Sequence, residues 1–388
     1  MKRICVFTGT RSEYGLLYPL LKKIQKSKDF DLQLIVSGMH LSSEFGLTYK
    51  QIEADGFKID EKTEILLSSD TDEGVCKTIG VALISLTDSL RRLKPDLFIV
   101  LGDRYETFAA SLTAYTMKIP IAHIHGGETT EGAFDEAYRH SITKMSYLHF
   151  TSTEVYKHRV IQLGESPERV FNVGAIGLDN INELQLMTIE ELEKEIGVCL
   201  KEKKNVIVTF HPTTLEPETN QENTLQLLMA LDQTDDIKIL FTKSNSDSQG
   251  RRINELLAEF VDKNPEKSKL IDSLGQLRYL SCLKHFDCVI GNSSSGIIEA
   301  PYFKTPTVNI GDRQKGRVKP ESVIDCNTYS LDIKRAIEKA FSQEFRSSIK
   351  KMNLPYGDGH ASDKIMDILK SELKSEINLK KQFYDIKW

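Results

Sequence analysis

The sequence contains little that would support a disulfide framework, a metal site built on cysteine, or a membrane span. Its six cysteines form no CxxC pair and are scattered through the chain. That distribution is typical of reduced thiols and indicates neither structural zinc nor redox chemistry. The longest early apolar stretch, residues 4–7, is too short for a signal-peptide core, and no run approaches the roughly 18 residues of a membrane span. We therefore expect a cytoplasmic protein with no membrane partner.

Glycine, proline and basic charge are not in excess either. The 23 glycines and 11 prolines fall short of a low-complexity composition. The 51 basic and 56 acidic side chains leave a net charge of −5. The chain therefore lacks the excess of positive charge that is typical of proteins that bind nucleic acid, and we expect no nucleic-acid partner. With 40% hydrophobic residues, the chain is typical of globular proteins, and its 388 residues favour two domains.

Short apolar runs that alternate with helical patterns predict an α/β fold. Strands that are buried on both faces under crossover helices produce this alternation in the sequence, so we expect two doubly wound parallel sheets. The expected domains are 1–185 and 186–360, and the amphipathic stretch 361–377 is expected to form a helix that packs back onto the first domain, within a final segment 361–388. Predicted strands are 4–7, 32–36, 97–101, 121–124, 148–151, 170–173, 206–210, 237–241, 286–290 and 307–310; predicted helices include 74–93 and the charged stretch 188–204.

Two such domains facing each other would place the carboxyl ends of both sheets around one central cleft. Ligands of doubly wound sheets bind at those ends, so motifs that carry chemistry should directly follow strands.

The segment GNSSSGIIEAP (291–301) follows a predicted strand and is expected to open a helix. Its serine hydroxyls and main-chain N–H groups, at the positive end of a helix dipole, suit a phosphate or diphosphate. Glu299 would repel an anion, but it could accept hydrogen bonds from a ribose diol. The alternative is that Ser295 only caps the helix and Glu299 is a favourable first-turn acid.

Two further motifs follow strands near the start of the chain. GTRSEYG (9–15) lacks the GxGxxG spacing of a dinucleotide site, which disfavours a nicotinamide enzyme, but Arg11 could clamp a phosphate. LGDRYE (101–106) places Asp103 and Arg104 at a strand end, although Asp103 could instead only cap a helix.

The densest polar segment is HIHGGETTEGAFDEAYRH (123–140). Such an acidic loop after a buried strand is where general acids and bases are positioned. His123 and His125, two apart on a strand, would share a face and could ligate a metal with Glu128, but no third ligand has a recognisable spacing. TFHP (209–212) follows another strand and presents His211.

At these residues the sequence resembles the hydrolysing UDP-N-acetylglucosamine 2-epimerases of sialic acid biosynthesis. GTRSEYG, GDRYE, HIHGGE with DEAYRH, TFHPTT, GNSSSGIIEAP and NIGDRQKGR occur in the family's order from end to end. The resemblance implies two Rossmann-like domains in a glycosyltransferase-B-like arrangement. It also implies conversion of UDP-GlcNAc and water to N-acetylmannosamine and UDP, without a cofactor or a metal. The oligomer that it implies is a homodimer or a homotetramer.

The resemblance also assigns roles to residues of this chain. Catalytic positions are Asp103, Glu128, Asp135 and His211; UDP-binding positions are Arg11, Arg104, Ser293, Ser294, Ser295, Gly296, Glu299 and Arg313; His125, Glu131 and Arg139 are additional candidates. The resemblance leaves open which carboxylate removes the hydrogen on C2 of the sugar (H-2). Three alternatives remain: the same reaction on UDP-N,N'-diacetylbacillosamine, a glycosyltransferase of the same architecture, and a non-catalytic nucleotide-sugar sensor.

Overall fold

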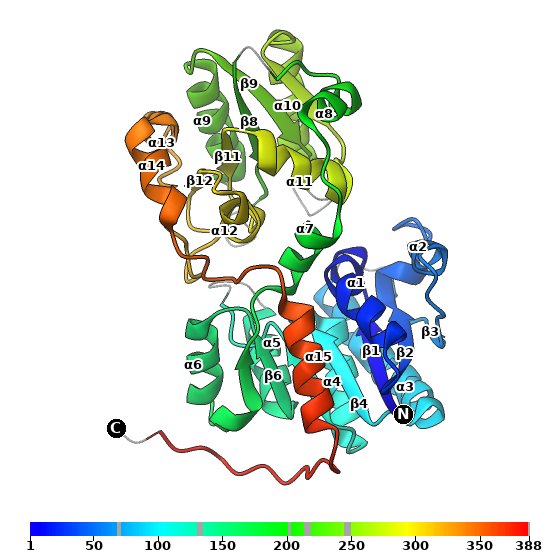
Figure 1. Cartoon of the computed structure of the whole chain (residues 1–388). Coiled ribbons are helices and arrows are strands. Elements are labelled where there is room, and N and C mark those ends of the chain that lie inside the picture. The colour runs from blue at the N-terminus through cyan, green and yellow to red at the C-terminus, as the bar shows by residue number, and fades with distance from the viewer. Residues whose placement is uncertain (68–70, 130–134, 201–202, 213–218, 244–249, 387–388) are drawn as a thin grey trace. The chain divides into compact units, whose positions relative to one another are not determined.

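The chain forms two compact units. The computed structural model describes residues 1–67, 71–129, 135–200, 203–212, 219–243 and 250–386. The first unit, here called unit 1, holds the described residues up to Glu183 together with those from Tyr356 onward, and unit 2 holds those from Leu184 to Pro355. Each unit is a parallel sheet flanked by helices (Figure 1).

Unit 1 contains a parallel sheet of seven strands in the order β3-β2-β1-β4-β5-β6-β7. Chain order reverses beside β1, as in a doubly wound fold. The strands are β1 (Lys2–Thr8), β2 (Phe30–Ser37), β3 (Glu61–Thr63), β4 (Leu97–Leu101), β5 (Ile121–Ile124), β6 (Leu148–Thr151) and β7 (Val170–Asn172). The helices are α1 (Arg11–Lys26), α2 (Tyr49–Ala54), α3 (Asp72–Leu93), α4 (Tyr105–Thr116), α5 (Asp135–Met145), α6 (Glu154–Gln162), α7 (Asp179–Glu183) and α15 (Ala361–Glu372).

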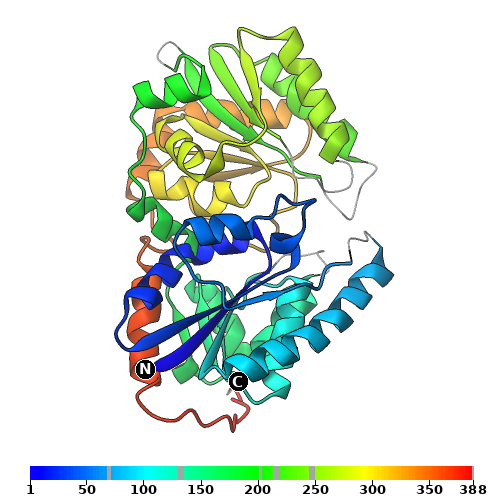
Figure 2. The same cartoon turned by 90° about the vertical axis from the view of Figure 1, so that its right-hand side faces the viewer.

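The two faces of the unit 1 sheet are covered by different helices, as both views show (Figure 2). In β1, Ile4 and Val6 pack with α1 and α15, whereas Cys5 and Phe7 pack with α3 and α4. This alternation follows from the two-residue period of a strand.

Helix α15 is joined to unit 1 by polar contacts as well as by its apolar side. The carboxylate of Asp179 accepts hydrogen bonds from the main-chain N–H groups of Ala361 and Ser362, at 2.8 and 2.6 Å, and so satisfies donors at the start of the helix. Lys23 of α1 pairs with Asp363 at 2.6 Å. The segment from Tyr356 onward therefore completes unit 1.

Unit 2 contains a parallel sheet of six strands in the order β10-β9-β8-β11-β12-β13. Helices α9, α10 and α13 contribute to one apolar core with it, and α8 contacts α11. The strands are β8 (Lys204–Thr209), β9 (Ile237–Thr242), β10 (Ser268–Ile271), β11 (Cys288–Gly291), β12 (Thr307–Ile310) and β13 (Val323–Cys326). The helices are α8 (Ile189–Ile196), α9 (Asn220–Asp232), α10 (Gly250–Lys263), α11 (Gly275–His285), α12 (Ser295–Ile298), α13 (Ser330–Phe341) and α14 (Gln343–Ser348).

The prediction of two doubly wound parallel sheets is confirmed, but two helix predictions are too long. The helix expected over 188–204 ends at Ile196, because Gly197 adopts the left-handed conformation (φ 63°) that ends helices. The helix expected over 361–377 ends at Glu372. Among the described residues, no helix is both long and apolar enough to cross a membrane.

Candidate active site

In unit 1, the residues after β4 carry two tightly held polar groups. Gly102 has a φ of 78° and turns the chain out of the strand. The next residue, Asp103, forms an ion pair with the buried guanidinium of Arg139 rather than capping α4. Arg104 binds the buried carboxylate of Glu106 through two hydrogen bonds, of 3.1 and 3.0 Å. Both groups are thus fixed at the carboxyl end of the sheet.

The residues after β5 bring a histidine and a buried acid together. His125 has a φ of 66°, and its Nδ1 lies 3.5 Å from Oε1 of Glu128. The same oxygen of Glu128 accepts a hydrogen bond of 2.7 Å from the Ser152 hydroxyl. Gly127 allows the loop to pass close to α6, because a Cβ there would lie 2.4 Å from the carbonyl oxygen of Tyr156. Glu128 is therefore held at a defined position.

Helix α5 supplies the third acid and the arginine that joins these loops. Asp135 begins the helix, and Arg139 lies one turn later on it. One guanidinium nitrogen of Arg139 donates to the His125 carbonyl at 3.0 Å, and another contacts Asp103. Burial, together with the negative charge of Asp103, raises the pKa of Asp135. Unit 1 thus brings together Asp103, His125, Glu128, Asp135 and Arg139, whereas Glu131 lies outside the described residues.

The alternative of a metal held by His123 and His125 does not fit the geometry. Strand β5 ends at Ile124, and the positive φ of His125 breaks the alternation that would place both rings on one face. The ring of His123 already contacts the Gly102 carbonyl at 2.8 Å and the Thr143 hydroxyl at 3.2 Å. Burial lowers the pKa of His123 to about 3. Among the described residues, no group of three potential ligands forms a metal site.

Sequence reasoning identified Arg11 but missed the neighbouring Glu13. Arg11 is exposed at the start of α1. Glu13 is buried, and its carboxylate accepts hydrogen bonds from the main-chain N–H groups of Gly9, at 2.8 Å, and Thr10, at 3.2 Å. Burial raises its pKa to about 7. Thr10 and Glu13 have the sequence spacing of a capping box, and this spacing could have identified Glu13 from the sequence.

In unit 2, a reciprocal pair of hydrogen bonds fixes His211 after β8. The side-chain amide of Asn292 accepts from the His211 N–H and donates to the His211 carbonyl, both at 2.8 Å. Gly291 makes this approach possible, because a Cβ there would lie 1.9 Å from the Thr209 carbonyl oxygen. Burial, and then the charge of Arg313, lower the pKa of His211 to about 4. His211 is therefore neutral near pH 7.

The serine-rich segment after β11 differs in part from its predicted form. Helix α12 has only four residues and its N-cap is Ser294, so neither the predicted capping role of Ser295 nor a strong helix dipole is present. Gly296 packs closely on Thr307, since a Cβ there would lie 2.6 Å from the Thr307 methyl carbon. Arg313 donates to the Asn292 carbonyl at 3.1 Å, which brings it to the same segment. Any anion here would be bound mainly by hydroxyl, main-chain N–H and guanidinium groups.

Three buried polar side chains at this segment lack ordinary partners. The hydroxyls of Tyr279 and Ser295 and the Oε2 atom of Glu299 are buried. The Ser295 hydroxyl lies beside the other two groups, but among the described residues none of the three atoms makes a hydrogen bond of good geometry. Burial raises the pKa of Glu299, and the Ser295 hydroxyl acts in the opposite direction. Buried polar atoms without partners are rare in native proteins, so this group indicates a place for ligand hydroxyls or amides. Tyr279 was missed because nothing in its sequence surroundings distinguishes it from a core residue.

A cavity of about 540 Å³ opens at the same edge of the unit 2 sheet. Its lining includes Phe210 after β8, Asn292 after β11 and Gly311 after β12. The order of strands reverses between β8 and β11, which is where doubly wound sheets bind ligands.

Comparison with known proteins shows the family to which the chain belongs. The family described as UDP-N-acetylglucosamine 2-epimerase matches residues 22–370. The chain belongs to the UDP-N-acetylglucosamine 2-epimerase family. A Campylobacter jejuni member, named GDP/UDP-N,N'-diacetylbacillosamine 2-epimerase (hydrolyzing), is 43% identical over 99% of this chain and 99% of its own. Polysialic acid biosynthesis protein P7 of Escherichia coli is 39% identical over 100% of this chain and 98% of its own.

Solved structures of the UDP-N-acetylglucosamine 2-epimerase family share the fold. The crystal structure of the Neisseria meningitidis UDP-GlcNAc 2-epimerase bound to UDP-GlcNAc matches with a TM-score of 0.82 at 22% identity, over 96% of this chain and 100% of that one. A Listeria monocytogenes putative UDP-N-acetylglucosamine 2-epimerase matches with a TM-score of 0.80 at 17% identity, over 99% of each chain. Both are two-domain α/β proteins of the glycosyltransferase-B-like type, and the chain is an enzyme of this family.

Proposed function

We propose that the protein is a hydrolysing 2-epimerase that converts UDP-GlcNAc and water to N-acetylmannosamine and UDP, for sialic acid biosynthesis. The observation that carries the proposal is the cluster of acids in unit 1, where Arg139 joins Asp103 to the loop that bears Glu128. A sensor gains nothing from several acids beside a bound diphosphate. General acid and base chemistry needs them.

The chemistry requires loss of UDP before a proton can be moved at C2. H-2 of a hexosamine is not acidic, because no carbonyl lies beside it. When the C1–O bond breaks and UDP departs with its electron pair, C1 gains oxocarbenium character and H-2 becomes acidic. A carboxylate then removes H-2 to give a 2-acetamidoglucal. Water adds at C1 while a proton is delivered to C2 from the opposite face, which gives the manno product.

The acids of unit 1 divide these proton transfers. Asp135 suits the removal of H-2, because its raised pKa makes its carboxylate a stronger base than an ordinary aspartate. Proton return from the opposite face needs a second group, and Asp103 and Glu128 are the candidates. The hydrogen bond from Ser152 fixes the direction of the Glu128 carboxylate. His211 acts as a neutral hydrogen-bonding group, since its pKa lies at about 4.

The residues of unit 2 would hold and stabilise the leaving UDP. Ser293, Ser294 and Arg313 offer donors to the diphosphate, an electrostatic contribution of the oxyanion-hole kind. The buried carboxylate of Glu299 can accept from the ribose hydroxyls. Arg11 and Arg104 are the proposed unit 1 contacts of the diphosphate.

UDP-N,N'-diacetylbacillosamine is the second candidate substrate. The Campylobacter relative at 43% identity is named for it, and so is a Legionella pneumophila relative at 35% identity over 96% of this chain and 96% of its own. Parallel assays with this sugar and UDP-GlcNAc, read by mass spectrometry, decide between them through kcat/KM.

Isotope labelling tests the reaction itself. Turnover in D₂O should place one deuterium at C2 of the product, and turnover in ¹⁸O water should leave UDP unlabelled while C1 gains ¹⁸O. N-acetylmannosamine alone in the same water controls for exchange at C1. Label in UDP would mean attack at phosphorus, and release of N-acetylglucosamine without an acceptor would instead favour a transferase.

A further inference from the structure

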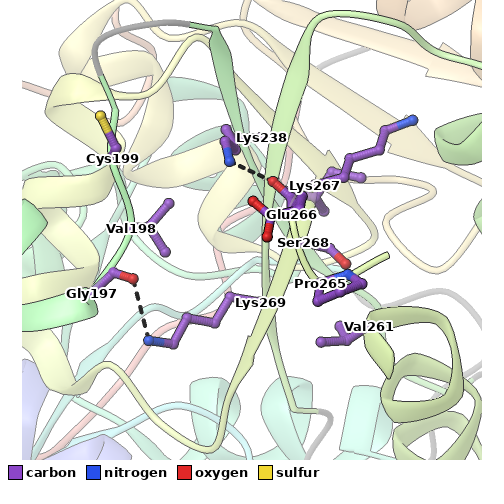
Figure 3. A pocket seen from close by; sticks show the side chains of 11 residues that line it. Gly197, Val198, Cys199, Lys238, Val261, Pro265, Glu266, Lys267, Ser268 and Lys269 are labelled. Carbon is purple, nitrogen blue, oxygen red and sulfur yellow. Dashed lines mark hydrogen bonds between the residues drawn. The ribbon is translucent and has the colours of Figure 1, made fainter. Parts of the chain in front are cut away.

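A cavity of about 400 Å³ lies in unit 2 at the amino ends of β9 and β10 (Figure 3). Lys238 is the second residue of β9, and Ser268 and Lys269 begin β10. The strands are parallel, so this edge is opposite the one that bears His211 and Ser293. At about 3.3 Å per residue, the six residues of β9 separate the two edges by roughly 17–20 Å.

One wall of this cavity, residues 197–199, is fixed to the end of α8. The Gly197 N–H donates to the Glu193 carbonyl at 2.8 Å, and the Glu193 carboxylate accepts from the Leu200 N–H at 2.7 Å. Gly197 also leaves room for an ammonium group, because a Cβ there would lie 2.8 Å from Nζ of Lys269. This wall of the cavity therefore lies directly against the side chain of Lys269.

Two ammonium groups are only partly used by the protein. Nζ of Lys238 donates to the Glu266 carbonyl, and Nζ of Lys269 lies 3.5 Å from the Gly197 carbonyl, as the dashed lines show (Figure 3). Each ammonium carries three donors, so both retain N–H groups for a ligand. Lys267 is turned away toward the carbonyl of Leu231, at 2.8 Å, and adds positive charge nearby.

The rest of the lining is mixed in character. The exposed carboxylate of Glu266 can accept hydrogen bonds from hydroxyl groups, and Val198, Val261 and Pro265 offer apolar surface. The volume falls within the range of small-molecule sites.

We propose that this pocket binds a small polyhydroxylated anion, a sugar phosphate or a sugar acid, whose charged group contacts Lys238 and Lys269 while its hydroxyls contact Glu266. A neutral sugar would offer neither ammonium group a charged acceptor, and the single carboxylate of Glu266 does not balance the charges of Lys238 and Lys269. Because the pocket is separated from the candidate active site by the length of the sheet, the anion and UDP bind independently.

Calorimetric titration of the full chain, with and without UDP, tests the proposal. The probes are glucose 6-phosphate, gluconate and neutral glucose. At least one anion should bind, at least about 10-fold more tightly than glucose, with the same affinity in the presence of UDP. Comparison of the two anions tells whether phosphate or carboxylate is preferred. Failure of both anions to bind, or competition with UDP, overturns the proposal.

Variants locate the binding. Lys238→Gln with Lys269→Gln should weaken anion binding at least about 10-fold, whereas Lys350→Gln, which removes the same charge at an exposed position, should have no effect. Val198→Trp fills the pocket without changing its charge and should also abolish binding. If both pocket variants bind the anion as the wild type does, the site is elsewhere and the proposal is wrong.

Discussion

The guanidinium of Arg139 pairs with the carboxylate of Asp103, and it also donates a 3.0 Å hydrogen bond to the His125 carbonyl. One buried side chain therefore connects the loops that follow β4 and β5. Asp103 and His125 are 22 residues apart in sequence, yet neither can move without disturbing a contact of Arg139.

Replacing Arg139 with lysine should test this connection. An ammonium keeps the charge but lacks the planar fork that reaches two acceptors at once. We expect kcat to fall by about 10- to 100-fold, because misplaced catalytic groups are costly, while UDP affinity stays unchanged. Steady-state kinetics and calorimetry give both quantities, and Arg335→Lys, at an exposed position, is the control. A lower UDP affinity with unchanged kcat would contradict the assignment.

Tyr279→Phe should separate stability from ligand binding. The tyrosine hydroxyl is buried without a partner of good geometry, so its removal should leave the free energy of unfolding unchanged or raise it by about 1 kcal/mol. UDP affinity should fall several-fold if that hydroxyl contacts the nucleotide. Urea unfolding and calorimetry measure the two effects. Reduced stability with unchanged UDP affinity would make the hydroxyl a structural group.

Glu13→Gln should change how stability depends on pH. The folded-state pKa of Glu13 is about 7, above the ordinary value of 4.5, so the folded protein keeps a proton that the unfolded chain loses. Stability from this group is present below about pH 4.5 and is lost as pH rises to about 7, by up to about 3 kcal/mol. Urea unfolding at pH 5 and pH 8 should show a smaller difference in the variant than in the wild type. Glu53→Gln, at an exposed position, should keep the wild-type difference.

Exhaustive chelation should leave activity intact. Both ring nitrogens of His123 contact protein groups, so this histidine is not available as a ligand beside His125. The assay compares dialysed enzyme in excess chelator with untreated enzyme. Loss of activity that zinc or manganese restores would show that a cation takes part.

The interior strands of each sheet and the edge strand β7 could be predicted from the sequence, whereas the other edge strands could not. Strands β4, β5, β6 and β12 have the predicted bounds, because every residue in them is buried and apolar residues occupy at least every other position. The edge strands β3, β10 and β13 were not predicted. Each is short, pairs on one side only, and carries polar residues.

The same limit applies to the candidate site. Motifs after strands pointed to Asp103 and His211, since chain topology alone places such residues at the carboxyl edge of a sheet. The partners that hold them could not be found in this way, because Arg139 is 36 residues from Asp103 and Asn292 is 81 residues from His211. Such pairings depend on how the elements pack.

The discontinuity of unit 1 has a consequence for biosynthesis. Residues from Tyr356 onward leave the ribosome after all of unit 2, yet Ala361 and Ser362 bind Asp179, and the Tyr356 carbonyl accepts from the Ala175 N–H at 2.7 Å. The described residues of unit 2 lie in one stretch of the sequence, Leu184 to Pro355, which can fold during translation. Unit 1 must wait with the α1 side of its sheet only partly covered, because α15 completes the apolar cluster there. A nascent chain arrested before α15 should therefore bind chaperones mainly through unit 1.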